Sequence, residues 1–343
     1  MIVANSVEDI VVLMKSKGYK VSAITCHDNL NAKKNCEQFF VIKKFSYRAI
    51  LYALKKISAL NSKDIIFGSG VAEMVDAKKI FPKLMFLWNS PEILIKLNNP
   101  SYLFSKLSSL GVRIPMWSQV PPINGNYLYK DIRSYGGLLI NEFSKSLKIV
   151  NSSKKYFQKF VKGTNISVQF FSKSNKIKIL SYCKQWNYER RKYLLGGIIS
   201  INLDNSLMKK LEKIINTIVL NFNLVGINSI DFIITNNEPL KIYLIDINPR
   251  PGLSSRILYR QTIGKSILNY SSQIIYSFDN KLMDKRSIEK LINIDPNIKF
   301  TEIPLPDTII KKNQPICLAH RKVRDIGSLK KEYHNILEKI NNI

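Results

Sequence analysis

One stretch of the sequence, residues 240–256 (LKIYLIDINPRPGLSSR), places the strongest constraint on how the chain can fold. Its apolar run, followed by two prolines and a glycine, predicts a buried strand that ends in a polar turn. Because successive side chains of a strand point to opposite faces, Asp246, Asn248 and Arg250 share one face. A carboxylate, an amide and a guanidinium are costly to bury without partners. The stretch therefore predicts a site where a metal ion and a phosphate group supply those partners.

The segment before this stretch predicts a second strand that pairs with it. Residues 224–234 (LVGINSIDFII) are largely apolar and β-branched, and a polar turn follows at 236–238. In the resulting hairpin, Asp231 comes roughly opposite Asp246 and shares its face. Two carboxylates and the amide oxygen of Asn248 are hard oxygen ligands, which suit Mg²⁺ (or Mn²⁺) and not zinc. The hairpin therefore predicts a metal site that nucleotide phosphates would complete.

A phosphate-binding lysine is also predicted, because phosphoryl transfer needs positive charge beyond the metal. Lys130 lies on the predicted strand 126–132, and Gly136 and Gly137 follow it in a loop. A strand lysine and a glycine loop could hold and cover phosphates. The plain alternative is a solvated lysine before an ordinary Gly-Gly turn, and only the metal-binding face favours the phosphate role.

The length of 343 residues predicts two or three domains, and 45% hydrophobic residues suffice for their cores. No stretch approaches the roughly 20 apolar residues of a membrane helix, and the N-terminus lacks the features of a signal peptide. The cysteines, Cys26, Cys36, Cys183 and Cys317, are scattered without a CxxC pair, which argues against disulfides or structural zinc. We therefore expect a cytoplasmic protein with reduced thiols and no membrane partner.

The formal net charge is +28, from 53 Lys+Arg and 25 Asp+Glu. Such a charge is compatible with nucleic-acid binding. However, only 11 of the basic residues are Arg, and Lys, Ile and Asn all have A/T-rich codons, so compositional drift explains the charge as well. The basic residues are spread over the chain without interleaved aromatics. We expect an anionic small molecule or nucleotide as the main partner, with a homodimer left open as the assembly.

Residues 1–98 alternate predicted strands and helices, which indicates a parallel sheet covered by helices. The first helix is expected to be capped by Ser6, with Asp9 in a weak capping box and Gly18 beyond its last turn. The glycine turn at 68–70 lacks the third glycine and the acidic residue of a dinucleotide fingerprint. We expect an ordinary turn at the carboxyl end of a strand there, close enough to contact a ligand.

After this region the pattern changes to an antiparallel α+β arrangement. A short helix at 100–111 precedes five strand-like segments with few helices between them. A broad apolar stripe predicts a helix at 206–222, and another helix is predicted at 264–277. A proline-rich segment, a last strand and a lysine-rich helix close the chain within 300–343.

In the order of these segments, the chain resembles the ATP-grasp superfamily of carboxylate–amine ligases. It is especially similar to predicted ATP-dependent carboligases related to biotin carboxylase, over nearly the whole chain. The resemblance is carried by a lysine–glycine loop, a hinge and a metal hairpin, which are YLYKDIRSYGG, YFQKFVKGTNISV, and GINSIDFII followed by YLIDINPRPG. The segments IIFGSG, LWNSPEILIKL and LGVRIP resemble the pre-ATP-grasp domain and its linker, and IPLPDTIIKKNQPICLAH resembles the C-terminal strand segment.

The resemblance implies an ATP-grasp fold, mixed α/β and α+β, with a Rossmann-like pre-ATP-grasp domain at 1–98. Residues 99–343 would form the ATP-grasp domain, with two α+β lobes, a hinge near 158–163 and a C-terminal strand and helix segment at 300–343. The implied cofactors are ATP and Mg²⁺ (or Mn²⁺). The implied partners are a small carboxylate and an amine.

The resemblance also implies a role for each residue of the site. Lys130 would bind the α- and β-phosphates, Gly136 and Gly137 would let the loop close, and Arg250 would face an acyl-phosphate. The remaining roles would be metal binding by Asp231, Asp246 and Asn248, and adenine or ribose binding by Gln158, Lys159, Phe160, Val161 and Asn165.

The chain departs from the usual family pattern at four positions. Asp246 stands where Glu is more common, and it keeps the ligand chemistry with a reach about one methylene shorter. Gln158 and Lys159 stand where many relatives have an acid, and Asn165 stands where a ribose-binding Glu is common. Backbone contacts from the hinge do not depend on these side chains.

Other polar residues receive plainer interpretations. Arg190 and Arg191 could bind an anionic substrate, although such a cluster is usually a solvated loop. Trp186 is expected to pack, Cys183 to be a small buried residue, and no histidine is expected to be catalytic.

The favoured hypothesis is an ADP-forming ligase that makes an amide through an acyl-phosphate, with Lys130 and Arg250 as catalytic residues. The alternatives are a carboxylase-like or kinase-like enzyme, a non-catalytic ATP-binding protein, and a basic nucleic-acid-binding protein.

Overall fold

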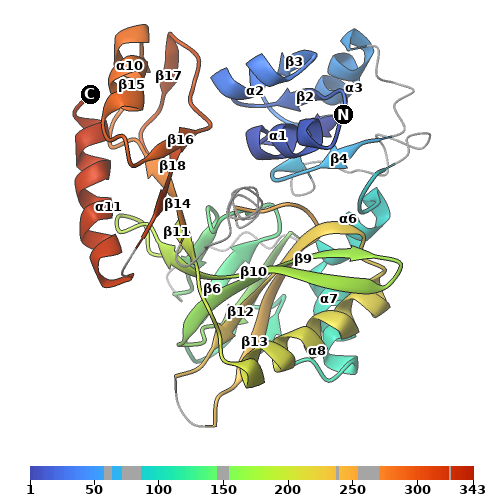
Figure 1. The fold of residues 1–343 in the computed structure, drawn as a ribbon. Helices are drawn as coiled ribbons and strands as arrows, with labels where there is room; N and C mark the ends of the chain where they lie inside the picture. Colours follow the sequence, from blue (N-terminus) through green and yellow to red (C-terminus); the bar gives the residue numbers. More distant parts are fainter. Residues whose placement is uncertain (58–63, 72–85, 145–153, 237–238, 254–269, 324–325) are drawn as a thin grey trace.

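The computed structural model describes residues 1–57, 64–71, 86–144, 154–236, 239–253, 270–323 and 326–343. The N-terminal elements lie at the upper right of Figure 1, and the C-terminal elements lie at the upper left. The strands and helices between them fill the lower half of the molecule.

The N-terminal part contains the predicted parallel sheet, in the order β3-β2-β1-β4. Its elements are β1 (Ile2–Val3), α1 (Glu8–Ser16), β2 (Ser22–Thr25), α2 (Leu30–Asn35), β3 (Gln38–Val41), α3 (Tyr47–Lys56) and β4 (Ile66–Phe67). Gly18 has a φ of +84°, as expected for a glycine just beyond a helix. The short helix α2 was not predicted.

The predicted capping box at the start of α1 is wrong. The N-cap residue is Val7, and no side chain of the helix caps its own N-terminus. Instead Glu302, far along the chain, accepts hydrogen bonds from Ser6 Oγ (2.6 Å) and from the Glu8 backbone N–H (3.2 Å). A carboxylate at a helix N-terminus is favourable for the same reason that a local cap is, so the tertiary contact replaces the local one.

Two antiparallel sheets follow the linker helices α6 (Pro91–Leu97) and α7 (Pro100–Ser109). The small sheet has the order β5-β8-β6-β7, with β5 (Trp117–Ser118), β6 (Tyr127–Asp131), β7 (Ile140–Glu142) and β8 (Lys155–Lys159). The large sheet has the order β13-β12-β9-β10-β11-β14-β18-β16. Its strands are β9 (Thr164–Lys173), β10 (Lys176–Asn187), β11 (Leu195–Ser200), β12 (Gly226–Ile234), β13 (Ile242–Asn248), β14 (Tyr270–Tyr276), β16 (Lys299–Thr301) and β18 (Pro315–Lys322).

The helix predicted at 264–277 is wrong over residues 270–276, which form β14 between β11 and β18. Residues 264–269 lie outside the described residues. Ser271, Ser272 and Gln273 are buried along with their apolar neighbours. Because both faces of this strand are covered, its sequence shows no alternation of polar and apolar residues that would indicate a strand.

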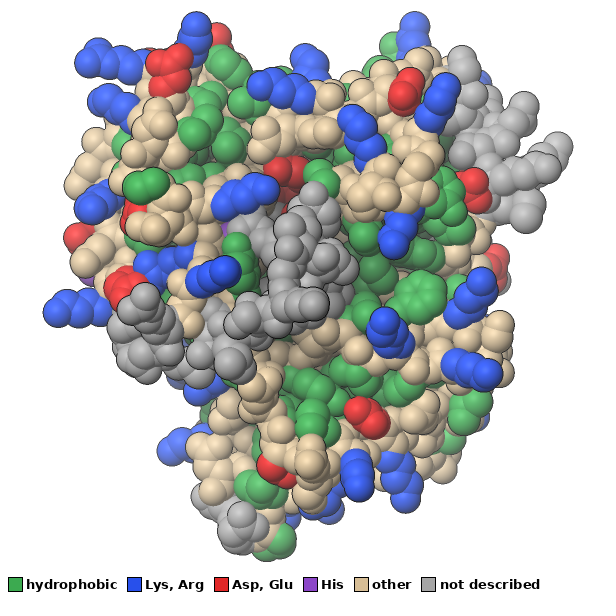
Figure 2. All heavy atoms as spheres, in the orientation of Figure 1, with side chains coloured by type: hydrophobic (Ala, Val, Ile, Leu, Met, Phe, Trp, Pro, Cys, Tyr) green, Lys and Arg blue, Asp and Glu red, His purple; other side chains and the backbone are tan. Residues whose placement is uncertain are grey.

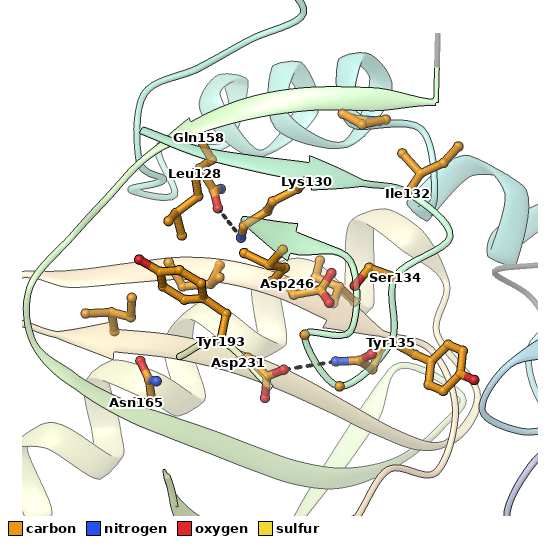
Figure 3. Close-up of a pocket in the computed structure, with 18 of the residues that line it drawn as sticks. Leu128, Lys130, Ile132, Ser134, Tyr135, Gln158, Asn165, Tyr193, Asp231 and Asp246 are labelled. Atoms are coloured by element: carbon orange, nitrogen blue, oxygen red, sulfur yellow. Dashed lines mark hydrogen bonds between the residues drawn. The ribbon is translucent and has the colours of Figure 1, made fainter. Parts of the chain in front are cut away.

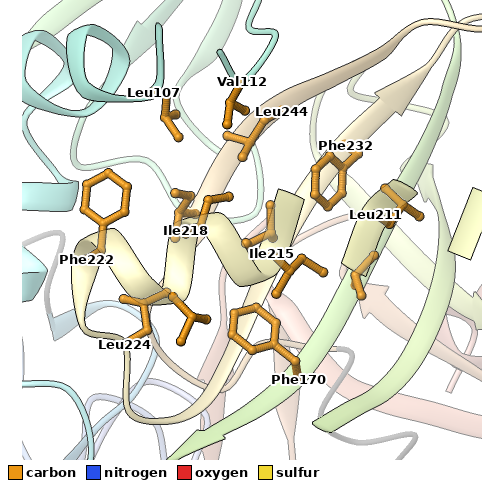
Figure 4. Packing of buried hydrophobic residues seen from close by; sticks show 14 of the residues in the cluster. Leu107, Val112, Phe170, Leu211, Ile215, Ile218, Phe222, Leu224, Phe232 and Leu244 are labelled. Carbon is orange, nitrogen blue, oxygen red and sulfur yellow. The ribbon is translucent and has the colours of Figure 1, made fainter. Parts of the chain in front are cut away.

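The main hydrophobic core lies between the large sheet and the predicted helix α8 (Asn205–Phe222), with α7 packed beside it. Asp204 caps α8 by accepting a hydrogen bond from the Leu207 backbone N–H (2.8 Å). Figure 4 shows Leu211, Ile215 and Ile218 on the apolar face of α8. They pack against Phe170 of β9, Phe232 of β12 and Leu244 of β13. One face of the large sheet is therefore committed to the core, and polar residues occupy the other.

The C-terminal elements build a second core against the far end of the large sheet. They are β15 (Lys281–Met283), α10 (Lys285–Asn293), β17 (Thr308–Ile310) and α11 (Ile326–Asn341), which is the predicted lysine-rich helix. Within the described part of the chain, no helix combines the length and apolar character needed to cross a membrane. All four cysteines are free.

Candidate nucleotide and metal site

A cavity of about 410 Å³ is lined by residues of both antiparallel sheets and of the linker helices. Figure 3 shows Lys130 and Gln158 on strands of the small sheet and Asp231 and Asp246 on strands of the large sheet. The structure brings every residue that the resemblance assigned to the nucleotide, the metal or the acyl-phosphate to this cavity. They are Lys130, Gly136, Gly137, Gln158, Lys159, Phe160, Val161, Asn165, Asp231, Asp246, Asn248 and Arg250.

Two carboxylates face each other across the hairpin of β12 and β13. Asp231 pairs directly with Asp246 in the antiparallel register, so both side chains project from the same face. Asn248, in the next pair on that face, donates from Nδ2 to Asp231 Oδ2 (3.1 Å), and Gln185 Nε2 donates to Asp231 Oδ1 (3.1 Å). Asp231 and Asp246 were predicted to lie roughly opposite each other, and the observed register, with a shift between Asp231 and Phe232, pairs them directly beside the amide of Asn248.

The electrostatics of this pair favour a bound cation. Burial and the neighbouring Asp246 raise the pKa of Asp231 from 3.8 to about 6, against hydrogen bonds and the nearby Arg250 that lower it. Two adjacent carboxylates repel each other, and a divalent ion would relieve that repulsion. Arg250 is itself buried beside the pair.

Lys130 lies opposite the carboxylates, on β6. It is 7% exposed, and its Nζ donates to Gln158 Oε1 (2.6 Å) on the neighbouring strand β8. Burial lowers the pKa of Lys130 from 10.5 to about 8, whereas the charges of Asp246 and Asp231 raise it. The Nε2 atom of Gln158 is buried and has no hydrogen-bond partner within the described part of the chain, so this end of the cavity keeps a polar donor for a ligand.

The glycine loop after β6 closes onto the turn between β10 and β11. Gly136 and Gly137 have φ of +57° and +80°, and Gly136 O accepts a hydrogen bond from the Leu195 N–H (2.8 Å). A Cβ atom at Gly137 would lie 1.8 Å from the Tyr193 carbonyl oxygen, so only glycine permits this contact. Glu142, at the end of the same hairpin, forms an ion pair with Lys192 and accepts a hydrogen bond from the Tyr193 hydroxyl (2.7 Å).

The predicted hinge is the covalent link between the two sheets, because β8 ends at Lys159 and β9 begins at Thr164. The backbone N–H groups of Lys159 and Phe160 donate to Met116 O (2.7 Å) and Asn126 O (2.8 Å), which fixes the start of the link to the small sheet. Both sides of the link line the cavity.

The donor set fits Mg²⁺ bound together with phosphates. Among the described residues, no group of three or more His, Cys, Asp and Glu could hold a metal alone. Mg²⁺ commonly binds through one or two carboxylates and completes its shell with waters and phosphates. Asp231, Asp246 and Asn248 match that requirement.

Some cavity residues carry no signal in the sequence. Gln185 contacts Asp231, and Tyr193 lines the cavity beside the glycine loop, yet neither belongs to a motif. The arginine pair has other contacts, since Arg190 stacks on the Phe278 ring (3.5 Å) and Arg191 donates to Leu138 O (3.0 Å). Neither arginine is among the residues that line the cavity.

Two further residues pack as expected. Trp186 makes an edge contact with Tyr333. Cys183 is buried, which raises its thiol pKa to about 12 and leaves it unreactive.

Residues 98–254 match the family model of the ATP-grasp domain. The chain contains an ATP-grasp domain. The matched segment contains all twelve of the predicted site residues that line the cavity. The chain is also 25% identical to an uncharacterised protein of Methanocaldococcus jannaschii, over 91% of this chain and 86% of that protein.

Solved structures share the fold over nearly the full length of the chain. The N5-carboxyaminoimidazole synthetase of Staphylococcus aureus, solved with ADP, has a TM-score of 0.72 at 13% identity, covering 98% of this chain and 96% of that one. The L-amino acid ligase of Bacillus licheniformis has a TM-score of 0.69 at 11% identity, with coverage of 98% and 96%. These similarities confirm the predicted fold class, including its N-terminal domain.

Proposed function

We propose that this protein is an ATP-dependent ligase that joins a carboxylic acid to an amine, forming an amide and releasing ADP and phosphate. One observation carries the proposal: a buried lysine of the small sheet, a carboxylate pair of the large sheet and a buried arginine just beyond β13 line one cavity at the link between the sheets. Phosphoryl transfer depends mainly on such positioning and charge neutralisation.

The proposed reaction has two steps. A carboxylate oxygen of the acid attacks the γ-phosphorus of ATP, the bond between the γ-phosphorus and the bridging oxygen breaks, and ADP leaves. The amine nitrogen then attacks the acyl carbon of the acyl-phosphate, inorganic phosphate leaves, and the nitrogen loses a proton.

The residues of the chain would act by holding charge in place. Lys130 would bind α- and β-phosphate oxygens, and Arg250 would bind the transferred phosphoryl group on the side of the acid. The hinge would hold the base through its backbone, and Gly136 and Gly137 would let the loop cover the phosphates. Mg²⁺ held by Asp231, Asp246 and Asn248 would neutralise phosphate charge and orient the triphosphate.

Three further assignments belong to this proposal. We place the boundary between the N-terminal domain and the ATP-grasp domain at residues 98 and 99. We expect small, anionic substrates, because the net charge of +28 favours them. On the face shown in Figure 2, Lys and Arg side chains are scattered and form no continuous patch, which supports a small molecule over a nucleic acid as partner.

The test is ADP release from ATP and Mg²⁺ across a panel of acid–amine pairs. We expect release that requires both substrates and is lost in Asp246→Ala, while the variant keeps its melting temperature within a few degrees. Asp279→Ala is the matched control, because that carboxylate is exposed and pairs with Lys312 away from the cavity. Failure of ATP with Mg²⁺ to raise the melting temperature of the unaltered protein would contradict the nucleotide assignment.

A further inference from the structure

The segment that leaves the N-terminal domain contacts the turn after β13 through the buried side chain of Asn89, which donates to the Pro249 carbonyl oxygen. Phe86 adds a last bridge to the N-terminal parallel sheet, and Asn89 follows three residues later, just before α6. Asn89 is 5% exposed and lies outside the segment that matches the ATP-grasp domain.

The amide of Asn89 ties together the ends of β12 and β13. Its Nδ2 donates to the Pro249 carbonyl oxygen (2.8 Å) and to Asn228 Oδ1 (2.6 Å), and its Oδ1 accepts from the Val225 N–H (2.7 Å). Both donor hydrogens and the acceptor of this buried amide are therefore in use. Asn228 in turn donates to Gly226 O (2.8 Å), which continues the cluster within β12.

Pro249 stands between two residues of the site, Asn248 and Arg250. Its ring fixes φ, so the direction of its carbonyl sets ψ and with it the peptide plane that leads to Arg250. Asn89 holds that carbonyl. A hydrogen bond from outside the segment that matches the ATP-grasp domain thus restrains the peptide plane that leads to Arg250.

The cluster is too tightly packed to shift without breaking these bonds. Gly226 has a φ of +78°, and a Cβ atom there would lie 2.2 Å from Trp88 Cγ, so the Trp88 ring rests directly on the backbone of β12. Asn228 is fully buried and also donates to Ser172 Oγ (3.2 Å). The contact therefore transmits the position of the N-terminal segment to the turn at Pro249.

We propose that Asn89 is a positioning residue that orients Arg250 toward the γ-phosphate side of the nucleotide. This inference rests on the proposed function, because it assigns Arg250 to the transferred phosphoryl group. Asn89 itself touches neither the nucleotide nor the substrate. Its effect appears in how the site distinguishes a triphosphate from a diphosphate.

The test compares the affinities for a non-hydrolysable ATP analogue (AMPPNP) and for ADP, each with Mg²⁺, by isothermal titration calorimetry. Asn89→Ala should weaken AMPPNP binding relative to ADP binding by about fivefold, the loss expected for one buried hydrogen bond. Asn89→Ser is the second variant, in case the alanine variant is too unstable. Asn228→Ala is the matched control, because it removes a neighbour of Asn89 in the same cluster whose side-chain hydrogen bonds are with Asn89, Ser172 and Gly226.

A double-mutant cycle with Arg250→Lys shows whether the effect passes through the arginine. We expect Arg250→Lys to reduce the preference for AMPPNP over ADP, and Asn89→Ala to cause no further reduction in the double variant. If Asn89→Ala weakened the binding of AMPPNP and of ADP equally, Asn89 would have only a general structural role and the inference would be overturned. The same would follow if Asn228→Ala changed the ratio of the two affinities as much as Asn89→Ala does. If the unaltered protein binds neither nucleotide, the proposed function fails and the inference fails with it.

Discussion

Two adjacent glycines of the loop after β6 have similar backbones and different surroundings. Both Gly136 and Gly137 occupy the left-handed region that side chains rarely adopt. A Cβ atom at Gly136 would meet only the Leu195 side chain, at 3.9 Å, whereas one at Gly137 would overlap the Tyr193 carbonyl. Substituting Gly136 should therefore cost only the strain of the backbone conformation, whereas substituting Gly137 should also cost the contact between the loop and the turn at Tyr193.

Gly136→Ala should lower the free energy of unfolding by about 1–2 kcal/mol, the cost of the left-handed conformation. Gly137→Ala should lower it more, because the loop must leave the turn at Tyr193, and it should also reduce the rise in melting temperature that ADP causes. Urea unfolding measures the first effect, and thermal unfolding with and without ADP measures the second. Equal behaviour of the two variants would mean that the closed contact contributes nothing to the site.

The proximity of residues that share a strand or a hairpin could be predicted from the sequence. The proximity of residues from distant segments could not. Alternation placed Asp246 and Asn248 on one face, and the short turn brought Asp231 roughly opposite Asp246. The direct pairing of the two carboxylates also depends on a register shift between Asp231 and Phe232, without which Ile245 would lie opposite Asp231. No local pattern relates Asn89 to Pro249, which is 160 residues away, or Glu8 to Glu302, which is 294 away. These contacts depend on how the domains pack, and a single chain read in order does not contain that information.

At the scale of elements, α8 carries much of the main core on one stripe. Ile215 is fully buried in that stripe, whereas Leu220, on the same helix, is 55% exposed. A periodic stripe of this kind is the strongest local signal of a helix, and the prediction at 206–222 agrees with the observed element to within one residue. By contrast, α2 has six residues and a single buried one, too few for any periodicity.

Ile215→Ala should lower the free energy of unfolding by about 2–5 kcal/mol, because it leaves a cavity beneath β9 and β12. Leu220→Ala on the same helix should change it by less than about 0.5 kcal/mol. Chemical denaturation of both variants checks the difference. A small loss for Ile215→Ala would show that α8 is not the main support of the large sheet.

At the scale of the molecule, the buried carboxylate of Glu8 and the partly buried carboxylate of Glu302 join the N-terminal domain to the C-terminal elements. Glu302 accepts hydrogen bonds at the start of α1 and from Asn29 Nδ2 (2.5 Å), and its backbone N–H donates to Glu8 Oε2 (2.6 Å). Burial and the nearby charge of Glu302 raise the pKa of Glu8 from 4.5 to about 7. This contact should therefore respond to pH near neutrality.

The folded protein binds a proton at Glu8 that the unfolded chain has already lost between pH 4.5 and about pH 7. The stabilisation from this group is complete below pH 4.5 and is lost as the pH rises through 7. We expect the melting temperature to fall between about pH 5 and pH 8, and the fall to be shallower in Glu8→Gln. Glu37→Gln, at an exposed glutamate, should keep the slope of the unaltered protein. An unchanged slope in Glu8→Gln would assign the pH dependence to other groups.

The contact of Trp88 and Asn89 with the residues from 226 to 228 also limits where the gene can be cut and recombined. The family match begins at residue 98, which suggests a breakpoint there. A junction at that point would take both Trp88 and Asn89 from the donor and set them against a strand that did not evolve with them. A chimaera with the N-terminal domain of a relative should be joined before Trp88, or should exchange the 226–228 segment as well.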